Sequence, residues 1–182
     1  NPLTIAIYNE FEAIAIQIVR HVDTPEKLNS KINEDNWTAL HFAAEKNMHK
    51  LIKNLIEKEA LILGDRNGAT PIHIAVKSGH IESTQALIHN MPNKKDELNK
   101  RLNTGETPLM IAAHNGHHEI VKQLCNDCDV NIKNKLGETA IMIAIKYAHL
   151  ESIRALIPIS DERITNKDGD SFIDLIFQMG LL

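Results

Sequence analysis

The chain has 182 residues, a net charge of −4 at pH 7 and a pI of about 6.2, so it lacks the basic surface that nonspecific binding to nucleic acid or anionic membranes requires. Its 43% content of hydrophobic residues is too high for a disordered chain, and its most apolar runs, such as 141–145, are too short to span a membrane. Because aromatic residues make up only 4%, we expect an aliphatic core.

The start of the chain and the cysteines indicate the cellular compartment of the protein. Residues 1–4 carry no secretory signal, and the missing initiator methionine suggests a fragment of a longer protein. The two cysteines, Cys125 and Cys128, are too few and too close together to staple a fold of this size. We therefore expect the cytoplasm or another reducing intracellular compartment, which would be a host cell cytosol for a microbial effector.

Six copies of one short pattern follow one another along the chain. Each begins with a polar residue and continues with an apolar, small-residue stretch. The copies begin at Asn1, Thr38, Thr70, Thr107, Thr139 and Ser171, at steps of 37, 32, 37, 32 and 32 residues. Self-similarity at a period of this length is typical of proteins built from stacked structural repeats.

Each complete copy predicts a hairpin turn followed by two helices. A threonine such as Thr70 caps the first helix, and Pro71 suits its first turn, where no N–H is needed. A second helix follows, as over residues 119–125, with its apolar residues on one stripe. The hairpin needs a positive φ, which suits glycine or asparagine. The residues in that slot are Asn36, Gly68, Gly105, Gly137 and Gly169.

The stretch TPIHIA at residues 70–75 resembles the ankyrin-repeat signature T-P-L-H-x-A, whose period is about 33 residues. The turn GHIE at 79–82 and the exit CDVN at 128–131 are also similar to that family. The resemblance implies an all-α ankyrin-repeat solenoid of about five and a half repeats in a single domain, 1–182. The expected repeats are 1–32, 33–64, 65–101, 102–133, 134–165 and a partial copy, 166–182.

This resemblance also implies a function. Ankyrin-repeat proteins generally bind other proteins through hairpin tips and first helices, which line a concave face. We expect a monomeric, non-catalytic protein–protein interaction module that needs no cofactor, binds a protein or an adjoining domain of its own chain, and contacts neither nucleic acid nor the membrane interior. The alternative is a targeting or regulatory arm of a larger multidomain protein, such as an enzyme or a secreted effector of an intracellular microbe.

The resemblance selects candidate contact residues position by position. They are Trp37, Asn67, Glu106, Leu136 and Glu138 in hairpin tips, and Tyr8, Glu45, Lys46, Lys77, His114, Asn115, Lys146 and Tyr147 at the ends of first helices. The three aromatic residues stand out because tryptophan and tyrosine dominate binding hot spots. For Trp37 the alternative is packing on its own neighbouring hairpin.

The family pattern assigns His41 and His73 a structural role, in which the histidine of T-P-L-H bonds to the backbone of a neighbouring hairpin. The 37-residue steps carry longer loops, 24–33 and 92–103, which share the pattern Leu-Asn-x-x-(Ile/Leu)-Asn. We expect a short extra helix in each loop, ending with an apolar residue tucked under the next hairpin. Whether these loops take part in binding stays open.

Residues 114–128 suggest a different chemistry, because they contain histidines and a C-x-x-C. His114, His117, Cys125 and Cys128 would supply two nitrogens and two thiolates for tetrahedral zinc. The spacing is not that of a standard zinc finger, and the repeat register makes His117 a turn residue, Cys125 a core-side helix residue and Cys128 an exit residue. A reactive thiolate favours a helix N-terminus, whereas this pair follows a helix. A zinc or thiol enzyme is the remote alternative, and we expect no catalytic or metal-binding residue.

Overall fold

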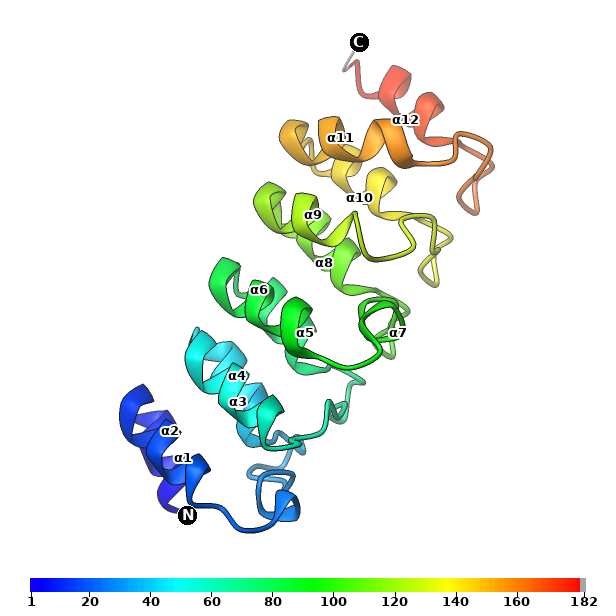
Figure 1. Ribbon diagram of the computed structural model, residues 1–182. Coiled ribbons are helices and arrows are strands. Elements are labelled where there is room, and N and C mark those ends of the chain that lie inside the picture. The colour runs from blue at the N-terminus through cyan, green and yellow to red at the C-terminus, as the bar shows by residue number, and fades with distance from the viewer. Residues whose placement is uncertain (181–182) are drawn as a thin grey trace. The chain divides into compact units, whose positions relative to one another are not determined.

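The protein is all-helical over residues 1–180, the part of the chain that the structure, a computed structural model, describes (Figure 1). In that range no strand forms, and Thr165 and Ser171 make an isolated antiparallel bridge. Nor is any helix in that range long and apolar enough to cross a bilayer. The all-α fold predicted from the sequence is confirmed.

The helices belong to two compact units. The first unit, Asn1–Pro92, contains α1 (Pro2–Tyr8), α2 (Glu12–Arg20), η1 (Pro25–Lys27), α3 (Ala39–Glu45), α4 (His49–Glu57), α5 (Pro71–Lys77) and α6 (Ile81–Asn90). The second unit begins at Asn93 and contains α7 (Lys94–Leu98), α8 (Pro108–Asn115), α9 (His118–Leu124), α10 (Ala140–Lys146), α11 (Leu150–Leu156), η2 (Ile157–Ile159) and α12 (Phe172–Gln178). The repeat boundaries and the single domain expected from the sequence stay predictions.

The first helices begin at the predicted threonines. Thr38, Thr70, Thr107 and Thr139 are N-caps with extended backbone, and each is at most 2% exposed. In α8 the Thr107 hydroxyl accepts a hydrogen bond from the Met110 N–H at 3.4 Å. A cap in this position satisfies one of the backbone donors that the start of a helix leaves without a partner.

The core is aliphatic, as the composition predicts. All of residues 39–44 in α3 are buried, and the small side chains of Ala43 and Ala44 let neighbouring helices approach closely. In the first unit α3 packs on α5 and α4 on α6, and in the second α8 packs on α10 and α9 on α11. Each helix pair therefore completes its core against the next pair of its unit, as expected for stacked repeats.

The hairpin tips are held by side chains that bond to the local backbone. Asn134 Oδ1 accepts hydrogen bonds from the N–H groups of Leu136 and Glu138, both at 2.9 Å. Asp65 and Asn166 each accept an equivalent pair of bonds in their own hairpins. Such bonds fix the tip conformation within each hairpin. The predicted positive φ is confirmed at Asn36, Gly68, Gly105, Gly137 and Gly169.

Both long loops contain the predicted short helix, as η1 in the first loop and α7 in the second. Leu28 and Leu98, which follow or end these helices, are 2% and 1% exposed. The second loop is also joined to a later segment of its unit, because Asn99 Oδ1 accepts a hydrogen bond from the Asp129 N–H at 2.8 Å. The role of the loops in partner binding stays open.

His41 connects its own helix to the next hairpin. Its Nδ1 accepts a hydrogen bond from the Thr38 N–H at 3.1 Å, so the ring proton lies on Nε2, which donates to the Ala69 carbonyl at 3.0 Å. Burial lowers the pKa of His41 and outweighs the opposing effects of the Ala69 bond and of Asp65, so the ring is neutral at pH 7. The structural role implied for His41 is confirmed. His73 Nδ1 accepts the corresponding N–H bond at 3.2 Å.

We expect the first unit to lose stability as the pH falls below about 6.5. The pKa of His41 lies below its ordinary value of 6.5, so between these values the unfolded chain binds a proton that the folded chain does not. The stabilisation is complete above 6.5 and is lost as the pH falls toward the lowered pKa. Urea unfolding at pH values from about 8 to about 5, followed by Trp37 fluorescence, measures this change in the free energy of unfolding. The stability of the His41→Gln variant should depend less on pH. A pH dependence equal to that of the wild type would contradict the attribution to His41.

Candidate functional site

A groove of about 540 Å³ opens between first helices and hairpin tips of the second unit, and we call it the α8–α10 groove. It is lined by Asn103, Thr104, Glu106, His114, Asn134, Lys135, Leu136, Glu138, Ile143, Lys146 and Tyr147. Six of these residues are among the contact residues selected from the sequence, namely Glu106, His114, Leu136, Glu138, Lys146 and Tyr147. The structure therefore gathers part of the sequence-selected set into one concave surface.

One wall of the groove is an aromatic stack. The rings of His114 and Tyr147 lie 4.3 Å apart between centroids with an interplanar angle of 18°. Nε2 of His149 lies 2.9 Å from the His114 carbonyl oxygen and donates to it, which joins α8 to the turn after α10. Asn115, also selected from the sequence, does not line the groove, and its Nδ2 donates to the Ile111 carbonyl at 2.8 Å.

Two apolar side chains are available to a ligand in this groove. Leu136 is 57% exposed at a hairpin tip, and Tyr147 is 46% exposed at the end of α10. The backbone of Leu136 is fixed by its N–H bond to Asn134, and the ring of Tyr147 is positioned by His114. Both side chains are therefore presented by ordered structure.

Two residues that line the groove, Glu138 and Lys146, form an ion pair. Glu138 Oε1 lies 2.9 Å from Lys146 Nζ, and Glu138 Oε2 accepts a hydrogen bond from Asn134 Nδ2 at 3.0 Å. Burial acts to raise the pKa of Glu138, but the bonds from Asn134 and Lys146 outweigh it, so this pKa lies below its ordinary value. The bond to Glu138 raises the pKa of Lys146. Both groups are charged at neutral pH and largely satisfy each other.

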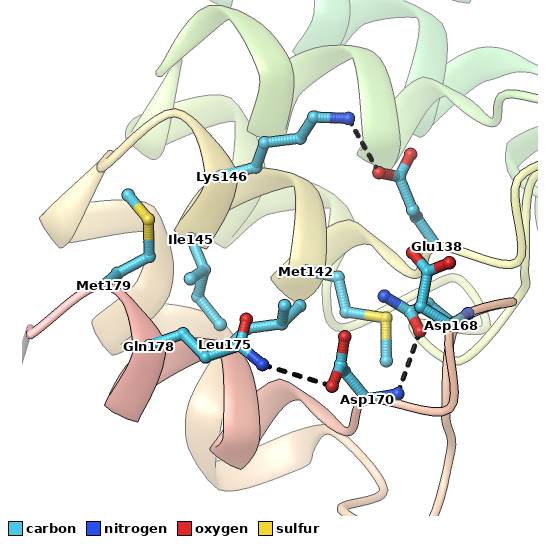
Figure 2. Close-up of a pocket in the computed structure, with 10 residues that line it drawn as sticks. Glu138, Met142, Ile145, Lys146, Asp168, Asp170, Leu175, Gln178 and Met179 are labelled. Atoms are coloured by element: carbon cyan, nitrogen blue, oxygen red, sulfur yellow. Dashed lines mark hydrogen bonds and ion pairs between the residues drawn. The ribbon is translucent and has the colours of Figure 1, made fainter.

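A second concavity, of about 290 Å³, lies between α10 and α12, and we call it the α10–α12 pocket (Figure 2). It is lined by Glu138, Met142, Ile145, Lys146, Asn166, Asp168, Asp170, Leu175, Gln178 and Met179. Figure 2 shows the carboxylates of Glu138, Asp168 and Asp170 gathered at one end, with Met179 at the other. Glu138 and Lys146 line both concavities, so the two adjoin each other.

Trp37 is half-buried in the first unit. Its Nε1 donates a hydrogen bond to Asp65 Oδ2 at 3.1 Å, and its ring centroid lies 5.8 Å from that of His41 and 5.0 Å from that of Phe42. These contacts favour the alternative weighed for this residue, packing on neighbouring hairpins. Contact of Trp37 with a partner stays a prediction.

The other contact residues selected in the first unit are exposed or half-buried. Tyr8 is 56% exposed, and its ring centroid lies 5.3 Å from that of Phe42. Lys46 Nζ lies 3.4 Å from Glu10 Oε1. The side chains of Glu45, Asn67 and Lys77 are exposed. These residues belong to the first unit, whereas the α8–α10 groove belongs to the second.

The cysteine pair lacks the features of a reactive site. Cys125 is the C-cap of α9, and both Cys125 and Cys128 are free and half-buried. Burial raises the pKa of Cys125 to about 11 and that of Cys128 to about 12. The sequence places Cys125 on the core side of α9, and the structure leaves it half-buried next to Leu124, which is 0% exposed. No group of three or more His, Cys, Asp or Glu residues within 1–180 could hold a metal ion.

Asp168 and Asp170 are not among the contact residues selected from the sequence. They occupy the tip positions of Leu136 and Glu138 one copy later, because Asn166 opens its hairpin as Asn134 does. The partial sixth copy matches the repeat pattern only weakly, so the pattern does not indicate contact residues at its hairpin tip. The 32-residue step between Thr139 and Ser171 is the signal that identifies these positions.

Comparison with curated proteins finds partial matches in three animals. Mouse ankyrin repeat domain-containing protein 53 is 30% identical over 110 residues, which is 58% of this chain and 22% of that protein. The nuclear factor NF-kappa-B p110 subunit of Drosophila melanogaster is 28% identical over 78 residues, 42% of this chain and 8% of that protein. The transient receptor potential cation channel subfamily A member 1 homolog of Caenorhabditis elegans is 34% identical over 68 residues, which is 36% of this chain and 6% of that protein. The chain thus spans a small part of each relative.

Solved structures and family models agree on the fold. The crystal structure of EF0377, an ankyrin repeat protein, is similar to this chain with a TM-score of 0.84, covering 98% of this chain and 92% of that one at 23% identity. At this identity the likeness concerns the fold. The model of ankyrin repeats in three copies matches residues 3–97 and 91–168. The threonine caps, the hairpins and these matches agree, and the chain belongs to the ankyrin repeat family.

Proposed function

We propose that this chain is a non-catalytic module that binds a protein partner through the α8–α10 groove. Ankyrin repeats are generally protein-interaction modules. The observation that carries the proposal is the presence of Leu136 and Tyr147, 57% and 46% exposed, in one concave surface of about 540 Å³. Concave surfaces with apolar side chains and a few polar groups are the usual places where proteins bind ligands.

The physical basis of binding is preorganisation. Aromatic anchors that are ordered before binding lose little conformational entropy when a partner covers them. Tyr147 is held by its stack on His114, and Leu136 by the Asn134 turn. The charged groups at the edge, such as the pair of Glu138 and Lys146, orient a partner more than they add affinity.

A second candidate is an ankyrin arm that targets or regulates a longer protein. It is supported by the relatives, because the matched segments are at most 22% of those proteins. In that case the groove binds an adjoining domain of the same chain, and the purified chain should bind that domain when it is added separately. We propose a reducing intracellular compartment for either candidate, since both cysteines are free.

Replacing Leu136 and Tyr147 together with alanine is expected to weaken partner binding at least about tenfold. Each truncation removes an anchor that we expect to contribute about 1 kcal/mol or more, and about 1.4 kcal/mol corresponds to tenfold in affinity. The probes are peptides selected from a random phage-displayed library against the immobilised chain. Calorimetric titration of the synthetic peptides compares wild type with the double variant.

Leu150→Ala is the matched control. Leu150 is 52% exposed on α11, close to the exposure of Leu136, but it does not line the groove. The control should bind the selected peptides with wild-type affinity, and all variants should melt near the wild-type temperature. Equal affinity of wild type and the Leu136→Ala, Tyr147→Ala variant would rule out the groove as the binding surface.

A further inference from the structure

The charged α10–α12 pocket adjoins the α8–α10 groove. Its chemistry indicates which side chains the partner presents. The two concavities share Glu138 and Lys146, so a ligand that covers Leu136 and Tyr147 extends naturally into the pocket. The inference below rests on the proposed function, because it concerns the partner of the same site.

The pocket carries an excess of negative charge. Of the ten residues that line it, three are carboxylates, Glu138, Asp168 and Asp170, and Lys146 is the one cation. Lys146 is held by Glu138 at 2.9 Å. Neither Asp168 nor Asp170 forms an ion pair within residues 1–180. The side-chain partner of Asp170 is a neutral amide, since Gln178 Nε2 donates to Asp170 Oδ1 at 3.2 Å.

The backbone that carries these two carboxylates is fixed by its hairpin. Asn166 Oδ1 accepts hydrogen bonds from the N–H groups of Asp168 and Asp170, both at 2.9 Å. Asp168 is exposed and Asp170 is half-buried. Figure 2 shows Asp168 and Asp170 beside Glu138 at the same end of the pocket. A cation entering this end meets carboxylates whose backbone is already ordered, so little further ordering is needed.

Four apolar side chains also line the pocket, namely Met142, Ile145, Leu175 and Met179. Met142 and Ile145 are 1% and 0% exposed and form its floor, while Met179 is 48% exposed at the far end from the carboxylates. An apolar floor with an acidic edge suits a side chain that has an aliphatic stem and a cationic head, which is the character of lysine and arginine. Methionine accommodates stems of different shape.

We infer that the partner presents a lysine or arginine to the α10–α12 pocket and an apolar side chain to Leu136 and Tyr147. Packed helices lie about 8–10 Å apart, and an extended chain advances about 3.3–3.6 Å per residue. The two side chains of an extended partner segment are therefore about two to three residues apart. The charge complementarity excludes an acidic or phosphorylated segment in the pocket, because its charge would repel Asp168 and Asp170.

Peptide selection tests this inference. Linear peptides selected from a random phage-displayed library against the wild-type chain should be enriched in lysine or arginine about two or three positions from an apolar residue. The Asp168→Asn, Asp170→Asn variant should bind these peptides about threefold to tenfold more weakly at about 0.01 M salt, where the Debye length is about 30 Å. The difference should shrink at about 1 M salt, where the Debye length is about 3 Å.

Glu162→Gln is the matched control, since Glu162 is an exposed acid that does not line the pocket. It should leave affinity unchanged, and thermal melting should show all variants folded. Peptides that depend on Leu136 and Tyr147 but show no basic preference would overturn the inference and leave the proposed function intact. An equal loss in Glu162→Gln, or a failure of the library to yield peptides, would also overturn it. Peptides that bind independently of Leu136 and Tyr147 would overturn the proposed function.

Discussion

His41→Ala is expected to lower the free energy of unfolding of the first unit by about 3 kcal/mol. The imidazole is 0% exposed and links the Thr38 N–H to the Ala69 carbonyl. Its removal leaves a buried donor and a buried acceptor without partners, each at a cost of about 1–3 kcal/mol, and opens a cavity. Urea unfolding followed by fluorescence of Trp37, the single tryptophan, reports on this unit because the indole stacks on His41.

His89→Ala is the matched control for this variant. His89 is exposed on α6 of the same unit, where its Nδ1 lies 2.8 Å from the Gln85 carbonyl. Surface substitutions of this kind usually change stability by less than about 0.5 kcal/mol. If the two variants were equally stable, the bond from His41 in α3 to the next hairpin would not be a main source of stability in the first unit.

Gly105→Ala is expected to destabilise the second unit by about 3 kcal/mol. Gly105 has a φ of +92°, and a side chain in this left-handed region costs about 1–2 kcal/mol. A Cβ would also lie 3.0 Å from the backbone nitrogen of Lys135 in the next hairpin. Backbone cannot give way without separating the two tips, and such overpacking costs about 1–3 kcal/mol. Guanidinium unfolding followed by circular dichroism measures the loss.

Gly169→Ala separates the cost of backbone strain from the cost of overpacking between the hairpin tips. Gly169 occupies the same hairpin slot with a φ of +90°, but a Cβ there would meet no atom within 4 Å. This variant carries the backbone strain alone, so we expect it to lose about 1–2 kcal/mol. The difference between the variants measures packing between the tips at Gly105 and Lys135. Equal losses would show that the close approach at Gly105 has no energetic consequence.

Most of the fold can be predicted from the sequence because each repeat carries its own local signals. Thr107 before Pro108 marks a helix start, and Gly105 marks the hairpin before it. These signals act over a few residues and recur at a regular step, so they are readable without tertiary information. The short helices at 25–27 and 94–98 are predictable for the same reason, since Leu28 and Leu98 occupy equivalent places.

The site is less predictable because side-chain direction depends on partners distant in sequence. Trp37 lies in a tip, as predicted, but its indole is held by Asp65, 28 residues later. Cys125 follows the periodic pattern of α9, but it is the C-cap of that helix and its side chain is half-buried. The acidic edge formed by Asp168 and Asp170 depends on the sixth copy packing against α10, which a weak repeat match does not reveal.

The location of the bound partner can be measured directly by amide hydrogen exchange of the chain with and without a selected peptide. If the partner covers the hairpin tips and first helices of the second unit, exchange slows in residues 103–114, 134–147 and 166–178. Exchange in α9 and α11, the second helices of the same unit, then stays unchanged. Slower exchange confined to α9 and α11, or to the first unit, would contradict binding through the α8–α10 groove.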